Sequence, residues 1–111
     1  MKMNCPACQT PTEIGIDESN MLQLDTEMIE EGEMPDAVGY RLHTDGSVTN
    51  IRREARDALA EEKSPPKIGR HRIEHRLLCP DGVTVSQVFM YPTRLRKIVE
   101  ARAKERVALI L

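Results

Sequence analysis

The sequence predicts an α+β fold in which a small antiparallel sheet is accompanied by two helices. Two Asp-Gly turn signals, Asp45-Gly46 and Asp81-Gly82, each stand between short runs that favour strands. A stretch with helical periodicity follows each of them. The 111 residues suffice for one modest core and not for two, so we expect a single domain over residues 1–111.

In the first half of the chain, residues 1–16 predict a cysteine-containing turn and a short strand at 13–16. Residues 17–37 are acidic, and both a short helix over about 18–31 and an acidic loop fit them. Residues 38–43 and 47–49 predict a hairpin. The helix that follows spans about 50–63 and ends at Ser64-Pro65-Pro66, because prolines cannot continue the helical hydrogen bonds. The apolar residues of this helix recur at helical spacing: Ile51, Ala55, Ala58 and Leu59.

In the second half, over residues 70–111, the segments 70–79 and 83–91 predict the two strands of another hairpin. Pro92-Thr93 then begins a helix that continues to the end of the chain. The stretches 41–46 and 76–82 are similar to each other. A duplicated ββα unit is one explanation of this similarity, and chance recurrence of a common turn signal is the other.

The charges are distributed unevenly along the chain. Residues 1–40 contain nine acidic residues and one lysine, which gives −8, whereas residues 41–111 contain fifteen basic and nine acidic residues, which gives +6. Such asymmetry favours binding to nucleic acid or to another charged partner. The alternative is that the acidic segment screens the basic half within one molecule.

Composition predicts a cytoplasmic protein. No apolar run approaches the ~20 residues of a membrane-spanning helix, and the N-terminus lacks the apolar stretch of a secretion signal. Three cysteines cannot all pair internally, which fits a reducing compartment better than disulfides do. With only three aromatic residues the core must be largely aliphatic, and a bound metal would help to hold it.

Cys5-Pro6-Ala7-Cys8 predicts half of a structural zinc site. A Cys-x-x-Cys turn presents two thiolates to one ion, and the proline stiffens the turn. A thioredoxin-like redox pair is the alternative, but that motif is expected between a strand and the start of a helix. Here the sequence after Cys8 favours an exit from a turn into a strand.

Two further ligands are needed for a four-coordinate zinc ion. Cys79, at the end of a predicted strand, is the third. In a straight strand His75 would lie ~13 Å from Cys79, and His71 twice as far, which excludes both. His43 occupies the place in the first hairpin that Cys79 has in the second, so we expect Cys5, Cys8, Cys79 and His43 to bind zinc, with Asp81 a weaker candidate.

These two cysteine motifs resemble the halves of a zinc ribbon separated by a long insertion. The resemblance covers about residues 3–16 and 70–91, and Cys79-Pro80-Asp81-Gly82 has glycine where a second cysteine would stand. It implies a small regulator that binds nucleic acid or the transcription machinery. Arginines on one face of a predicted strand and on a predicted helix agree with this, although few aromatic residues are present to stack on bases. The candidate nucleic-acid-binding residues are Arg70, Arg72, Arg76, Arg52, Arg53 and Arg56.

A protein-binding adaptor or inhibitor, of the kind that phages and mobile elements encode to bind a host protein, is the second hypothesis. The acidic segment would contact a basic surface of the partner. In the C-terminal helix Arg102 and Arg106 fall on the same face as the apolar stripe, which a simple core helix would not allow. The apolar end of this helix would then bind a host protein or a second copy in a homodimer. The residues concerned are Val107, Leu109, Ile110 and Leu111.

Catalysis is not expected. His43, Asp45-Gly46, Asn50 and Glu54 have a passing similarity to the pattern of HNH-type nucleases, but Leu42 and Ala55 stand where that pattern places further functional residues. The chain has no recognisable nucleophilic triad or glycine-rich phosphate loop.

Overall fold

The N-terminal part of the chain forms a three-stranded antiparallel sheet. The computed structural model describes residues 1–110, with side chains up to Glu105. Strands β1 (Lys2–Asn4), β2 (Pro11–Asp17) and β3 (Asn20–Asp25) lie in the order β1-β2-β3. Glu13 pairs with Leu24 and Ile14 with Gln23, so Ile14 and Leu24 lie on opposite faces of the sheet, and both are buried. The end of β3 places Asp25 inside the molecule, where its side chain is fully buried.

A two-stranded hairpin and a helix follow. Strand β4 (Tyr40–Leu42) pairs with β5 (Val48–Asn50), and α1 (Ile51–Ala60) begins directly after β5. The Asn50 side chain accepts hydrogen bonds from the backbone N–H groups of Arg52 and Arg53, which caps the helix. The two sheets share a small core of Leu24, Tyr40 and Val48.

The chain then returns across both sheets. Residues 70–74 are extended and form isolated bridges with Ile29, Tyr40 and Leu24. A single 3₁₀ turn, η1 (His75–Leu77), follows, and then α2 (Val85–Phe89) and α3 (Thr93–Ile110). A second core forms where α3 packs on this return segment, with Leu95 and Val99 against Ile73 and Leu78.

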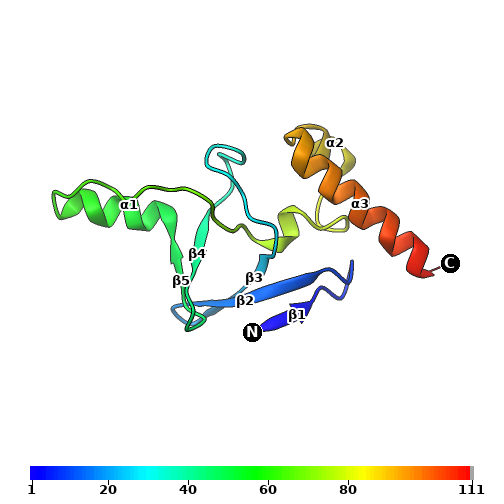
Figure 1. The fold of residues 1–111 in the computed structure, drawn as a ribbon, viewed down its shortest axis with the longest axis horizontal. Coiled ribbons are helices and arrows are strands. Elements are labelled where there is room, and N and C mark those ends of the chain that lie inside the picture. Colours follow the sequence, from blue (N-terminus) through cyan, green and yellow to red (C-terminus); the bar gives the residue numbers. More distant parts are fainter. Residues whose placement is uncertain (111) are drawn as a thin grey trace.

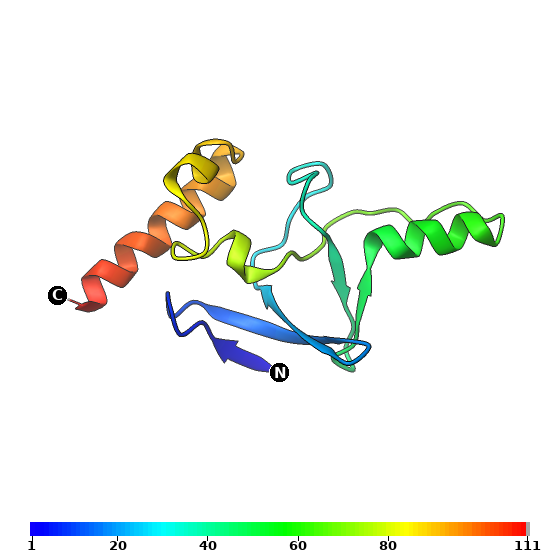
Figure 2. The ribbon, with the colours of Figure 1, turned by 180° about the vertical axis from the view of Figure 1, so that it is seen from behind.

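The described chain is elongated. Its principal extents are 56 × 29 × 17 Å, and its radius of gyration of 15.2 Å exceeds the about 13 Å typical of a compact domain of this length. Helices α1 and α3 lie at opposite ends of the long axis, with the two sheets between them (Figure 1), and the view from behind shows the same arrangement (Figure 2). Among the described residues, the helices are too short or too polar to cross a membrane.

The predicted α+β class with antiparallel sheets is confirmed, and so are the first hairpin, the helix after it and the C-terminal helix. Three local predictions are wrong. Residues 20–25 form β3 instead of a helix or loop, residues 75–77 form a 3₁₀ turn instead of the end of a strand, and residues 85–89 form a helix. The turn at Asp81-Gly82 therefore joins η1 to α2, and the second half of the described chain does not repeat the ββα order of the first.

Candidate metal centre

Four buried side chains converge between the N-terminal sheet and α3. The ligand atoms of Cys5, Cys8, His75 and Cys79 all lie within 4.8 Å of one another. The four side chains come from two parts of the chain separated by about two thirds of its length, so the fold and not local sequence brings them together. Three sulfurs and one imidazole at this separation could hold a metal ion.

The turn between β1 and β2 presents the first two cysteines. The backbone N–H of Cys5 donates to the Thr10 carbonyl, and the N–H of Gln9 donates to the Cys5 carbonyl, which closes a tight loop around the motif. Gln9 has a positive φ of 64°, so it reverses the chain direction after Cys8. The Cys8 sulfur lies 3.2 Å from the Thr10 hydroxyl, which fixes the rotamer of the thiol.

The turn η1 presents the other two ligands. Because the chain coils at His75–Leu77, residues 75 and 79 are one helical turn apart and face the same point. The prediction that excluded His75 assumed a straight strand, and that assumption is wrong. The next turn has the N–H of Gly82 donating to the Cys79 carbonyl, so the Cys-Pro-Asp-Gly segment has the turn expected of a knuckle. A Cβ at position 82 would lie 2.3 Å from the Arg76 carbonyl oxygen, which explains why a second cysteine is not accommodated there.

The distances match a shared ion better than a disulfide. The Cys5 and Cys79 sulfurs are 3.9 Å apart, and the Cys8 sulfur lies 3.3 Å from Nε2 of His75. Tetrahedral geometry with Zn–S near 2.3 Å and Zn–N near 2.0 Å gives about 3.8 Å between two sulfurs and about 3.5 Å between sulfur and nitrogen. A disulfide would need about 2.05 Å between sulfurs. The donor set therefore fits a tetrahedral metal ion.

A second layer of residues orients the histidine. Nδ1 of His75 lies 2.7 Å from Oδ2 of Asp25, and both side chains are almost completely buried. When Nδ1–H donates to this carboxylate, the lone pair of Nε2 faces the three sulfurs. A carboxylate behind a histidine ligand fixes the ring and increases its basicity. The other Asp25 oxygen accepts a hydrogen bond from the backbone N–H of Glu27.

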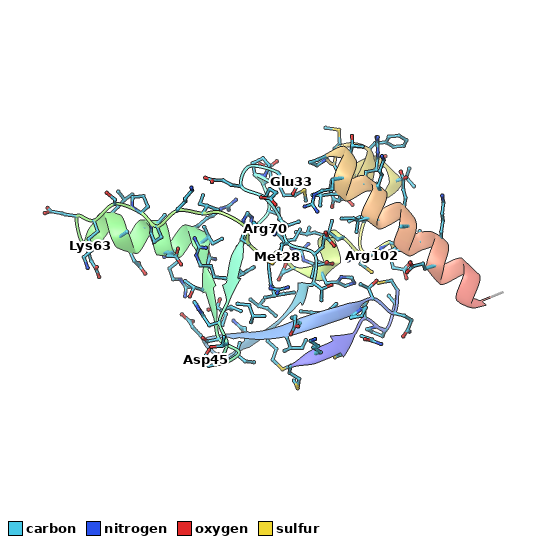
Figure 3. The ribbon with its side chains drawn as sticks, in the orientation of Figure 1. Met28, Glu33, Asp45, Lys63, Arg70 and Arg102 are labelled. Carbon is cyan, nitrogen blue, oxygen red and sulfur yellow. The ribbon has the colours of Figure 1, made fainter. Side chains whose placement is uncertain are left out.

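Arg102 completes this layer from α3. Its guanidinium donates to both carboxylate oxygens of Asp25, at 2.7 and 2.9 Å, and to the Leu78 carbonyl at 3.1 Å. Figure 3 shows Arg102 on the side of α3 that faces the body of the protein. This contact explains the arginine that interrupts the apolar stripe of the C-terminal helix, because Arg102 is directed inward to a buried charge.

The pKa values of these groups follow from their neighbours. Burial alone would raise the pKa of Asp25, but hydrogen bonds with His75 and Arg102 lower it to about 2. Burial alone would lower the pKa of His75, because it disfavours the charged imidazolium. The hydrogen bonds with Asp25 and Cys8 have a larger effect and raise this pKa to about 9.

The thiols differ from one another. Burial favours the neutral thiol of Cys8, yet hydrogen bonds with Thr10 and His75 lower its pKa to about 7. Burial and the neighbouring sulfur of Cys8 raise the pKa of Cys79 to about 12. Without a metal, the cluster therefore holds one thiol that ionises readily beside an imidazolium, and a cation would be needed to hold further thiolates together.

Cys8, His75 and Asp25 are also connected in the way of a Cys-His-Asp catalytic triad, with the Cys8 sulfur near one ring nitrogen of His75 and Asp25 near the other. Two observations favour metal binding over that chemistry. The Cys8 side chain is buried, and two further sulfurs, of Cys5 and Cys79, lie against the same imidazole, where a substrate would have to enter. A nucleophilic site requires neither of these sulfurs, whereas a tetrahedral ion uses both.

His43, the predicted fourth ligand, lies elsewhere. It is exposed, and its Nε2 is 2.7 Å from the Thr49 hydroxyl. Asp45, two residues further on, is at the tip of the β4-β5 hairpin and lies well away from Arg102 (Figure 3). The assignment of His43 is corrected, because equivalence of the two hairpins was its basis and the second hairpin does not form. His71 is buried against Gly39 and does not belong to the cluster. Asp81 is exposed next to the cluster and is not one of its four members.

The residues with a similarity to nuclease motifs have structural partners. Asp45 accepts hydrogen bonds from the backbone and hydroxyl of Ser47, and Asn50 caps α1. Glu54 forms an ion pair with Arg41 at 3.0 Å.

The arginines predicted to bind nucleic acid are dispersed, and several contact acidic residues of the same chain. Arg53 pairs with Asp17 and Glu18, and Arg70 pairs with Glu30. Arg72 donates to the Asp25 carbonyl, Arg76 pairs with Glu74, and Arg52 donates to the Pro35 carbonyl. Arg56 is exposed on α1.

Arg94, at the start of α3, extends this pattern. It binds Glu27, Glu33 and the Met28 carbonyl, and both Met28 and Glu33 lie in the segment that connects β3 to β4 (Figure 3). Arg94 and Arg102 therefore attach the helix to the acidic segment at two points. The side chains of Val107, Leu109 and Ile110, and all of Leu111, lie outside the part that the structure describes.

Comparison of the chain with protein-family models, with curated proteins and with solved structures gave no match.

Proposed function

We propose that this chain is a small zinc-binding protein whose metal centre is structural and which acts by binding another protein. The observation that carries the proposal is the convergence of Cys5, Cys8, His75 and Cys79 within 4.8 Å. Three thiolates and one imidazole form one of the common ligand sets of structural zinc. Softer thiolate ligands disfavour magnesium and calcium, which bind oxygen.

A closed site supports the structural role. Four protein ligands fill the tetrahedral coordination of zinc and leave no open position for water or substrate, which a catalytic zinc ion requires. All four ligands are buried. Bound zinc would connect the turn between β1 and β2 to η1, and Asp25 and Arg102 extend this connection to α3. A chain with two small aliphatic cores gains stability from such a cross-link.

Binding to a protein has more support than binding to nucleic acid. Ion pairs with the acidic segment neutralise the positive charges of Arg53, Arg70 and Arg94, and binding to a phosphate backbone would require such charges to be free. This arrangement agrees with the alternative that the acidic segment screens the basic half. Exposed apolar side chains gather instead at α2, where Val85 and Phe89 of the helix and Met90 directly after it face solvent.

The metal is tested by the zinc content of protein purified without added metal. We expect stoichiometric zinc in the wild-type protein and loss of zinc in Cys79→Ser and His75→Ala. His43→Ala is the matched control, because it removes an exposed imidazole outside the cluster and should retain zinc. Metal-free wild-type protein, or equal zinc loss in the control, would contradict the assignment.

Nucleic-acid binding is tested on the same preparation by titrating DNA and RNA at increasing salt concentrations. The proposal predicts no salt-sensitive binding that depends on Arg70, Arg72 and Arg76. Tight binding that falls steeply with salt and is lost on substitution of these arginines would favour a nucleic-acid function instead.

A further inference from the structure

An apolar groove runs between α2 and α3. Its volume is about 280 Å³, and its lining includes Val83, Val88, Val99 and Ala103. Pro80, directly after the proposed metal ligand Cys79, also belongs to the lining. The lining therefore joins α2 and α3 to the residue that follows a proposed metal ligand.

Exposed apolar side chains stand beside the groove. Val85 is 74% exposed, Phe89 69% and Met90 86%. Phe89 is the chain's only phenylalanine, yet it does not pack into the core. Isolated exposed apolar residues are common, but three in and directly after one short helix that lines an apolar groove form a patch typical of an interaction surface. Figure 1 shows α2 lying against the first half of α3 at one end of the molecule, away from both sheets.

We propose that this surface binds a second copy of the chain and forms a twofold homodimer. A twofold interface joins the same patch on both subunits, so the patch must contain both a projection and a matching recess. The surface offers both, because Phe89 lines the groove and is 69% exposed, while the other apolar side chains of the lining are valines, one proline and one alanine. Phe89 of each copy would then enter the groove of the other.

Charge on the rim supports the same occupant. Arg96 and Glu100 border the groove one helical turn apart on α3, and their side chains remain partly exposed. When two α3 helices cross antiparallel about a twofold axis between these residues, Arg96 of one copy faces Glu100 of the other. The two contacts are equivalent by symmetry, so the rim is complementary to itself.

This inference rests on the proposed function, since it names the protein partner. Sedimentation velocity of the zinc-loaded full-length protein over a range of concentrations tests it, with zinc content measured on each sample. We expect a monomer–dimer equilibrium that Phe89→Asp weakens by about 30-fold or more, as expected for an aromatic hot spot. Leu59→Asp, on α1, is the matched control, because Leu59 is 67% exposed and distant from the groove along the chain. It should leave the equilibrium unchanged.

A charge exchange keeps the test decisive if Phe89→Asp perturbs folding. Arg96→Glu and Glu100→Arg should each weaken the dimer, and the double variant should restore it, because the opposite charges then face each other again. A monomer at all concentrations, or a dimer unaffected by these substitutions, would overturn the inference. If the samples still contain stoichiometric zinc, the proposed function survives that result, whereas protein without zinc would contradict the proposed function itself.

Discussion

The buried carboxylate of Asp25 lies 2.7 Å from Nδ1 of His75 and joins β3 to the candidate metal centre. The same carboxylate accepts two hydrogen bonds from Arg102 of α3. One buried residue therefore orients a proposed ligand and anchors the C-terminal helix.

Asp25→Asn should weaken zinc binding by about 10–100-fold, the range typical for partners of metal ligands. The amide keeps the size of the side chain but removes the negative charge that favours Nδ1–H on His75. Competition with a chromophoric chelator measures the affinity. Asp36→Asn, an exposed acid, should bind zinc as the wild-type protein does. Equal affinities of the two variants would show that Asp25 does not orient the ligand.

Arg102→Met should destabilise the protein by about 3–5 kcal/mol, because it leaves the buried Asp25 carboxylate without its cationic partner. The free energy of unfolding of the zinc-loaded protein, measured in urea, tests this. Lys104→Met, an exposed change two residues away on α3, should have little effect. The double variant with Asp25→Asn should cost less than the sum of the single changes, because neither charge then remains buried alone. Strict additivity would argue against the coupling.

Zinc affinity should rise steeply between pH 7 and pH 9. In the metal-free protein the pKa values of His75 (about 9) and Cys79 (about 12) keep a proton on both groups over this range. Zinc must displace these protons, so binding becomes tighter as pH rises and weaker as it falls. The slope should decrease above pH 9, where His75 is already neutral. Chelator competition at several pH values measures this dependence, and a profile whose slope does not change near pH 9 would contradict the assignment of His75 as a ligand.

Gly82→Cys should destabilise the protein and should not improve zinc binding, although it restores the second cysteine of a zinc-ribbon knuckle. A Cβ at position 82 would lie 2.3 Å from the backbone oxygen of Arg76, so η1 or the turn must shift. Thermal unfolding with and without zinc measures the effect. Ser86→Cys, an exposed position on α2, controls for the added thiol. A variant as stable as this control would refute the close packing of η1 on the turn.

Local patterns predicted much of the fold because they reflect local physics. The Asp45-Gly46 turn and the cap at Asn50 define the first hairpin and α1. Strand β3 was missed because its turn with β2 uses Glu18 at a φ of 55°, and no glycine or asparagine marks that position. The start of α2 had a signal that could have identified it, since Thr84 and Gln87 form a capping box.

The site was predicted in part for the same reason. Cys5 and Cys8 form a local motif, and Cys79 was the only other cysteine, so these three could be identified from the sequence. The spacing of His75 and Cys79 places them on one face of a helical turn, but the strand assignment concealed this. Asp25 and Arg102 are separated from their partners by 50 and 77 residues, and no local spacing could have paired them. The sequence did contain one indication of this contact, because Arg102 is a charged residue on the apolar face of the predicted C-terminal helix.

X-ray absorption at the zinc edge of the purified protein tests the central claim most directly. A Cys₃His centre predicts three sulfurs at about 2.3 Å and one nitrogen at about 2.0 Å. His75→Ala, which is expected to lose zinc on purification, is loaded with added zinc for this measurement, and solvent oxygen should then replace the nitrogen shell, while His43→Ala leaves the spectrum unchanged. A shell with two sulfurs, or one in which His43 and not His75 supplies the nitrogen, would contradict the metal centre described by Cys5, Cys8, His75 and Cys79.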